Sequence, residues 1–189
     1  MAFPKPEKTY SYADYLTWDE SERWEIIGGI PYMQAAPSTK HQEVLMEISR
    51  QISNYLSGKS CKVYPAPFCV RLDLDENDNN VKNVVEPDIT IACDKSKIDD
   101  KGHKGAPDMI VEILSPSSGR NDKVLKFNKY EQAGVKEYWI VEPNEKIVSV
   151  FILQTNGKYG RPDMFVETDK IKISIFDNFE IDLKLVFSE

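Results

Sequence analysis

Two carboxylates interrupt the most apolar runs of the chain. Asp88 lies in the run Val-Val-Glu-Pro-Asp-Ile-Thr-Ile-Ala of residues 84–92, and Glu112 lies in the run Met-Ile-Val-Glu-Ile-Leu of residues 109–114. Burying a carboxylate is costly unless a cation, hydrogen bonds or a metal compensates its charge. On neighbouring strands these two acids could share one divalent ion, and such oxygen ligands suit Mg²⁺ or Mn²⁺. The alternative interpretation is that either acid faces solvent or pairs with a lysine.

A second group of polar residues follows Glu112 along the chain. Asp122, Lys126 and Tyr130 are spaced i, i+4, i+8, which places them on one face of a helix. The helix is expected to start a few residues beyond the Glu112 strand, so its first turns can fold back over the end of that strand. We therefore predict that Lys126 reaches the carboxylates. Taken alone, the helix is equally consistent with a solvated stripe that carries one Asp–Lys pair.

Glu25 and His41 are supporting candidates. Glu25 interrupts the apolar run Trp24-Glu25-Ile26-Ile27, and His41 opens the first long helix. An imidazole there could approach a phosphate or a water held by a metal. The alternatives are a paired surface acid for Glu25 and a helix-start residue with local hydrogen bonds for His41.

Several of these residues belong to motifs that occur in a fixed order. The chain resembles the Uma2 family, described as restriction endonuclease-like, over residues 10–185. The motifs that carry this resemblance are Glu25, Gly29, Pro37-Ser38 with His41, Pro87-Asp88, the stretch Val-Glu-Ile-Leu-Ser-Pro-Ser of residues 111–117, the helix residues Asp122, Lys126 and Tyr130, and the stretch Gly-Val-Lys-Glu-Tyr-Trp-Ile-Val of residues 134–141.

The resemblance implies the PD-(D/E)XK nuclease fold, a mixed sheet flanked by helices with an acidic site at one edge. It implies that Asp88 and Glu112 hold Mg²⁺ or Mn²⁺. In the usual pattern a lysine stands two residues after the second acid, but here that position is Leu114. Lys126 is then the candidate catalytic lysine, supplied by the next helix. Asp122 would hold Lys126 in place, and Tyr130 would pack or hydrogen-bond beside it.

The surrounding pattern predicts one α/β (α+β) domain over residues 1–189, with a mixed sheet and additional antiparallel strands. Gly28-Gly29 between two apolar runs predicts a β-hairpin. Apolar residues with a period of 3.6, from Val44 to Leu56, predict a helix that follows Pro37-Ser38-Thr39 and is ended by Gly58. Further strands are expected at residues 62–74, 84–93, 108–115, 138–141 and 146–153, a helix at 122–133, and short strands at 157–167, 171–175 and 180–185.

Composition restricts the possible partners. The net charge is −7, from 24 basic and 31 acidic residues, so no long-range positive field would gather nucleic acid. No apolar run approaches the roughly 20 residues of a membrane span. The three cysteines, Cys61, Cys69 and Cys93, lack a C-x-x-C pair and zinc spacing, which favours reduced thiols and a cytoplasmic location.

We therefore expect a Mg²⁺-dependent endonuclease with Asp88, Glu112 and Lys126 as its catalytic residues. Its expected substrate is nucleic acid, with DNA favoured, and a homodimer is plausible because enzymes that cut duplexes often use two-fold symmetry. One alternative is an inactive module of the same fold that binds nucleic acid or protein. Another is a metal-dependent hydrolase of small molecules, which would require a closed pocket.

Overall fold

The computed structural model describes residues 8–19, 21–73, 77–115 and 121–188, with the backbone alone at 121 and 122. None of the described helices has the length and apolar character that a membrane span requires. The helices are α1 Tyr12–Tyr15, α2 Thr39–Leu56, α3 Phe127–Ala133 and α4 Leu183–Val186, with a π-helical segment Asn121–Lys126 leading into α3.

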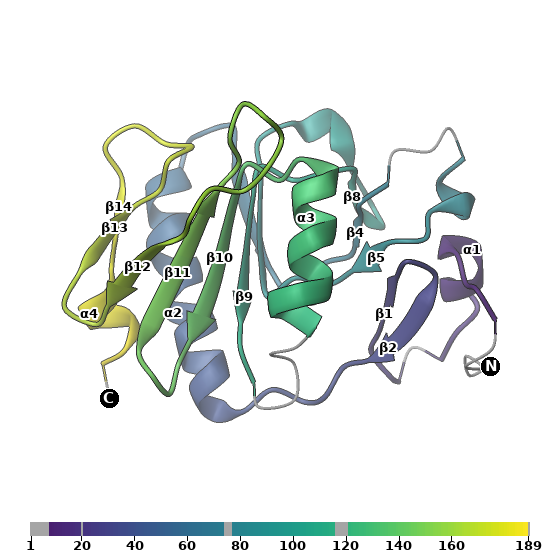
Figure 1. Ribbon diagram of the computed structural model, residues 1–189, viewed down its shortest axis with the longest axis horizontal. Helices are drawn as coiled ribbons and strands as arrows, with labels where there is room; N and C mark the ends of the chain where they lie inside the picture. Colours follow the sequence, from purple (N-terminus) through teal and green to yellow (C-terminus); the bar gives the residue numbers. More distant parts are fainter. Residues whose placement is uncertain (1–7, 20, 74–76, 116–120, 189) are drawn as a thin grey trace.

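Among the described residues the strands form two six-stranded sheets and a small two-stranded one (Figure 1). The first sheet has the order β2-β1-β5-β4-β8-β7, with β1 Trp24–Ile27, β2 Ile30–Met33, β4 Val70–Arg71, β5 Val84–Val85, β7 Ile98–Asp99 and β8 Gly102–Lys104. The second has the order β12-β11-β10-β9-β6-β3, with β3 Lys62–Pro65, β6 Ile89–Ala92, β9 Met109–Ile113, β10 Glu137–Glu142, β11 Ile147–Ile152 and β12 Asp163–Val166. The small sheet pairs β13 Lys170–Lys172 with β14 Glu180–Asp182.

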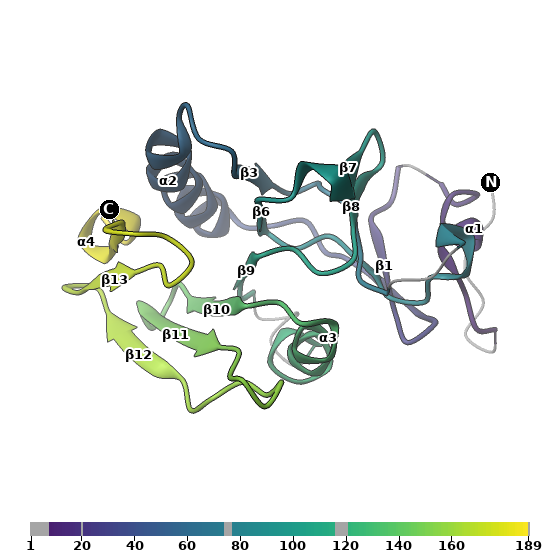
Figure 2. The ribbon, with the colours of Figure 1, turned by 90° about the horizontal axis from the view of Figure 1, so that it is seen from above.

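The two faces of the second sheet are covered by different helices (Figure 2). Alternate side chains of a strand point to opposite faces, and Met109, Val111 and Ile113 of β9 pack in the cluster that contains Ile48 and Ile52 of α2. Ile110 instead packs with Tyr130 of α3. Glu112 has the same parity as Ile110, so its side chain is directed to the α3 face.

The predicted hairpin and first helix are confirmed. β1 pairs with β2 around Gly28 and Gly29, whose φ values of 61° and 80° suit the tight turn. Helix α2 follows Ser38, whose side chain accepts a hydrogen bond from the backbone N–H of His41. This cap fixes the first turn of α2, which carries His41.

Two segments that were predicted as single strands pass from one sheet to the other. Residues 84–93 contain β5 of the first sheet and β6 of the second, with Pro87 between them. Residues 62–74 divide likewise into β3 and β4. Proline has no N–H for a ladder hydrogen bond, so each strand stops near a proline and the chain changes sheet. β3 is an edge strand of its sheet, whereas β4 lies inside its sheet.

Other differences are local. The expected helix at 122–133 is a π-helical segment followed by α3, and the expected strand at 180–185 is β14 followed by α4. The polar stretch 94–104 contains β7 and β8, which were not among the expected strands. Cys61 and Cys93 form a disulfide and Cys69 is a free thiol, so the expectation of three reduced cysteines is not met in the structure.

Candidate active site

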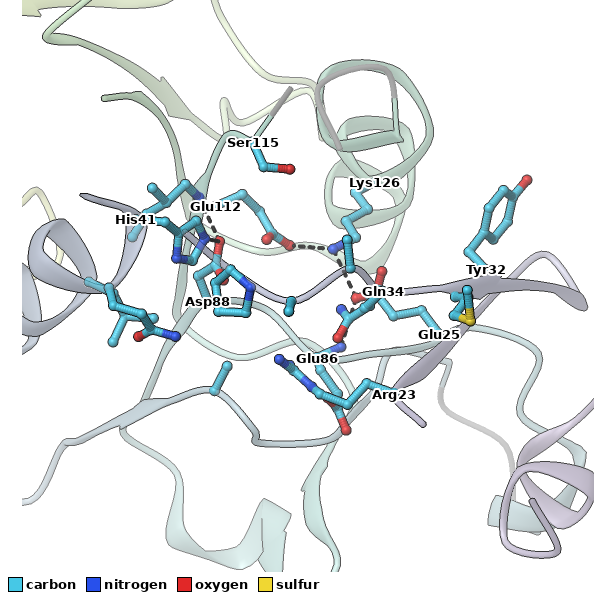
Figure 3. Close-up of a pocket in the computed structure, with 18 residues that line it drawn as sticks. Arg23, Glu25, Tyr32, Gln34, His41, Glu86, Asp88, Glu112, Ser115 and Lys126 are labelled. Carbon is cyan, nitrogen blue, oxygen red and sulfur yellow. Dashed lines mark hydrogen bonds and ion pairs between the residues drawn. The ribbon is translucent and has the colours of Figure 1, made fainter. Parts of the chain in front are cut away.

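A pocket of about 170 Å³ opens where the two sheets meet the start of α2 (Figure 3). The hairpin β1–β2, the crossing between β5 and β6, the end of β9 and the segment before α3 all contribute side chains. The polar residues that line it are Arg23, Glu25, Tyr32, Gln34, His41, Gln42, Glu86, Asp88, Glu112, Ser115 and Lys126.

Lys126 lies at the centre of a buried ion-pair cluster. Its Nζ is 2.8 Å from Glu25 Oε1 and 3.0 Å from Glu112 Oε1. The exposed fractions of Lys126, Glu25 and Glu112 are only 4%, 4% and 3%. Desolvated charges of this kind persist only when they are paired and hydrogen-bonded. The cluster therefore joins the first hairpin, β9 and the helix that follows β9.

Tyr130 completes the surroundings of Glu112. The Tyr130 hydroxyl donates a 2.5 Å hydrogen bond to Glu112 Oε1, the same oxygen that Lys126 contacts. Burial, and then the charges of Glu112 and Glu25, raise the pKa of Tyr130 well above its usual value. The phenol consequently stays a hydrogen-bond donor at neutral pH.

Asp88 occupies the crossing between β5 and β6, next to Glu112. Its Oδ2 accepts a 2.7 Å hydrogen bond from the backbone N–H of Ile113 and lies 3.1 Å from His41 Nε2. Among the described residues, no group hydrogen-bonds to Asp88 Oδ1. His41 Nδ1 is buried and has no hydrogen-bond partner there either. Helix α2 and β9 thus orient Asp88 from two sides.

Glu25 also supports this crossing. Its Oε1 accepts a 2.9 Å hydrogen bond from the backbone N–H of Glu86. The Glu86 carboxylate turns to Arg23 and Tyr15, at 2.9 Å from Arg23 Nη2 and 3.1 Å from the Tyr15 hydroxyl. Glu86 is therefore ion-paired with Arg23 and supports the wall of the pocket.

The structure brings together most of the residues predicted from the sequence. Glu25, Glu112, Lys126 and Tyr130 form one cluster, and His41 pairs with Asp88 beside it. The side chain of Asp122 lies outside the described residues, so its predicted contact with Lys126 is not described. In the described part of the chain, Glu25 and Glu112 hold Lys126.

The sequence prediction assigned no role in the site to Arg23, Gln34 or Glu86. Strand alternation gives a signal for Arg23, because it directly precedes β1, residues two apart on an extended chain share a face, and Glu25 faces the pocket. Gln34 gives no such signal, since a glutamine after a strand is usually a solvated residue.

The oxygen chemistry of the pocket suits a hard divalent cation. In the described part of the chain, no group of three His, Cys, Asp or Glu side chains is arranged so that it could hold a metal ion. Asp88 and Glu112 nevertheless provide two carboxylates at one pocket. Mg²⁺ is commonly held by one or two carboxylates and keeps several water ligands, so this donor set fits it.

Among the comparisons with known proteins, a family model identifies a family and a solved structure identifies a fold. The family model "Uma2: Putative restriction endonuclease" matches residues 12–184. An uncharacterized protein of Synechocystis is 26% identical over 160 residues, which cover 83% of this chain and 79% of that protein. A crystal structure from Anabaena variabilis, described as a putative nuclease belonging to DUF820, superposes with a TM-score of 0.74 at 20% identity, covering 93% of this chain and 97% of that one. This likeness confirms the fold.

Proposed function

Because the chain belongs to the Uma2 family of restriction endonuclease-like proteins, we propose that it is a Mg²⁺-dependent endonuclease that hydrolyses phosphodiester bonds in nucleic acid, with DNA as the favoured substrate. The observation that supports this most is the buried Lys126 ammonium, which lies against Glu112 beside Asp88 in one open pocket. An ammonium next to two acids is a combination suited to phosphoryl transfer.

In this proposal Asp88 and Glu112 hold the cation, together with the backbone carbonyl of Ile113. When bound there, such a cation would supply positive charge that could polarise a phosphoryl oxygen and lower the pKa of a water. His41 and the Ile113 N–H keep Asp88 in one orientation. Tyr130 does the same for Glu112.

Lys126 is the proposed catalytic lysine. Its ammonium offers three donors in a nearly dry setting, and Glu25 and Glu112 fix its direction. There it orients the attacking water or stabilises charge that develops on the phosphoryl oxygens. Electrostatic stabilisation of this kind is strongest where water is excluded.

The test is cleavage of plasmid and single-stranded oligonucleotide in Mg²⁺, Mn²⁺ or EDTA. We expect cation-dependent cleavage, and a loss of about 100-fold or more in Asp88→Asn, Glu112→Gln and Lys126→Met. Lys146→Met and Glu167→Gln are matched controls, because these residues form a pair elsewhere on the surface. Binding of Mn²⁺, measured by calorimetry, should weaken in Asp88→Asn and Glu112→Gln. Equal cleavage by the wild type and the three site variants would exclude this site.

A second candidate is a non-catalytic module that binds nucleic acid or protein. It is favoured by one observation: Lys126 forms ion pairs with both Glu25 and Glu112 and so offsets part of their charge. This alternative predicts neither cleavage nor Mn²⁺ binding by the wild-type protein. It also predicts that Lys126→Met lowers stability while ligand binding by the folded protein is retained.

A further inference from the structure

The open end of the first hairpin carries two polar side chains that the site described above does not use. The backbone N–H of Gln34 donates a 2.9 Å hydrogen bond to the carbonyl of Arg23, so these residues are cross-strand neighbours just beyond β1 and β2. Arg23 and Glu25 share one strand face, and Gln34 shares that face with Tyr32, which is opposite Glu25 in the register. All four line the pocket (Figure 3).

Gln34 has unused hydrogen-bonding capacity at the pocket wall. Its Oε1 is buried and has no partner among the described residues. Buried polar atoms are nearly always paired, so an orphaned one at a pocket calls for a ligand or water. The two ends of an amide are interchangeable by a flip about its last torsion. The amide can therefore present its two N–H donors to a bound group.

Arg23 is held in place and still accessible. Its Nε and Nη2 lie 3.0 and 2.9 Å from Glu86 Oε2, and the Tyr15 hydroxyl binds the other oxygen of Glu86. Nη1 has no hydrogen-bond partner within the described residues. The Arg23 side chain is 38% exposed, whereas that of Lys126 is 5% exposed. The Arg23 guanidinium therefore lies nearer to the mouth of the pocket than the Lys126 ammonium does, and its Nη1 edge is available to a ligand.

The negative charge of the pocket indicates what Arg23 and Gln34 would bind. Four carboxylates line it, from Glu25, Glu86, Asp88 and Glu112, and within the described residues Arg23 and Lys126 are its only lysine or arginine side chains. Lys126 is occupied by two glutamates deep in the site. A polyanionic strand that enters this acidic pocket therefore needs a second cation near the mouth, and a guanidinium matches the geometry of phosphate oxygens.

We propose that Arg23 and Gln34 form a phosphate subsite, which holds the backbone phosphate next to the phosphodiester that reacts. Arg23 contacts that phosphate through its open Nη1 edge, and the Gln34 amide donates a hydrogen bond to the same group. Glu86 and Tyr15 act as positioning residues for Arg23. This inference rests on the proposed function, because its ligand is nucleic acid. The subsite requires no contact with a base.

The experiment measures equilibrium binding of a fluorescent oligonucleotide by anisotropy over a range of KCl concentrations, in EDTA and again in Ca²⁺. For Arg23→Gln we expect binding about tenfold weaker and a salt slope smaller by about one phosphate contact. Arg23→Lys should keep the slope. Gln34→Ala should weaken binding to the same extent for oligonucleotides of different base sequence. Arg50→Gln is the matched control, because Arg50 also pairs with a glutamate, Glu47, but lies on the exposed side of α2.

The outcomes separate the subsite from the proposed function. If the wild type binds oligonucleotide and the Arg23 and Gln34 variants match Arg50→Gln in affinity and slope, the subsite is wrong while the proposed function stands. A base-dependent effect of Gln34→Ala would contradict its assigned phosphate contact. If the wild type binds no oligonucleotide in either buffer, both proposals fail. Circular dichroism and urea unfolding of each variant show whether weakened binding reflects a lost fold.

Discussion

Lys126 and Glu25 form a buried ion pair, 2.8 Å from Nζ to Oε1, between the segment before α3 and the first hairpin. Both side chains are 5% exposed. Removing one member of such a pair leaves a desolvated charge behind. We therefore expect Lys126→Met to lower the free energy of unfolding by about 3–5 kcal/mol, measured by urea denaturation.

The double variant Lys126→Met/Glu25→Gln tests the pairing itself. Its loss of stability should be smaller than the sum of the losses in the two single variants. The reason is that a neutral glutamine replaces the glutamate that Lys126→Met alone would leave uncompensated. Lys146→Met removes a cation from the surface pair with Glu167 and should leave stability nearly unchanged. Strict additivity in the double variant would mean that Lys126 and Glu25 do not interact in solution.

Tyr130→Phe removes a hydroxyl that donates to Glu112 and leaves the packing of the ring. We expect a loss of about 1–3 kcal/mol in the free energy of unfolding, since the hydrogen bond goes to a charged, buried acceptor. If the proposed enzyme activity is present, kcat should fall while KM changes little. Tyr159→Phe is the control, because the Tyr159 hydroxyl bonds the carbonyl of Val135 away from the pocket. A fall in KM alone would argue against a role in orienting Glu112.

The Cys61–Cys93 disulfide should stabilise the protein by restricting the conformations of the denatured chain. It joins residues separated by 32 positions, and a closed loop of this length is worth about 3.7 kcal/mol, or roughly 7–15 °C in Tm. Dithiothreitol should lower the Tm of the wild type and of Cys69→Ser, but leave that of Cys61→Ser/Cys93→Ser unchanged. Three titratable thiols in the unreduced wild-type protein would contradict the disulfide.

His103 makes stability depend on pH. Burial lowers the pKa of His103 below its ordinary value of 6.5, while a hydrogen bond to the Gly105 carbonyl opposes this effect. The unfolded chain therefore takes up a proton near pH 6.5 that the folded chain does not yet bind. The contribution to stability is present above pH 6.5 and is lost as the pH falls, at up to about 1.4 kcal/mol per pH unit.

This dependence is measured by urea unfolding between pH 5 and 7.5. His103→Gln should show a shallower slope over that interval than the wild type, because the variant lacks the titrating ring. Equal slopes would mean that the pKa of His103 is the same in the folded and unfolded states.

Part of the site could be predicted from the sequence, because a charged residue within an apolar run is easy to recognise. Glu25 and Glu112 each interrupt an apolar run, and both prove to be buried against Lys126. Helical spacing linked Lys126 with Tyr130, and both contact Glu112. These inferences used local patterns, for which burial and periodicity are direct physical guides.

The remainder required three-dimensional information. The run 84–92 is apolar on both sides of Pro87, so its pattern does not reveal that β5 and β6 belong to different sheets. The Arg23–Glu86 pair depends on that crossing. Gln34 acquires its place from pairing with Arg23 beyond the end of the hairpin. Such contacts depend on how distant segments dock, and no local pattern carries that information.

The crossings between the two sheets have a mechanical consequence. Two of the passages of the chain between the sheets, at residues 66–69 and 86–88, are tied by a 2.9 Å hydrogen bond from the Ala66 N–H to the Asp88 carbonyl. A movement of one sheet against the other at this point would have to stretch that hydrogen bond and bend both passages. Asp88 and Ala66 both line the pocket. Relative displacement of the two sheets is therefore restrained beside the pocket, next to one of its charged groups.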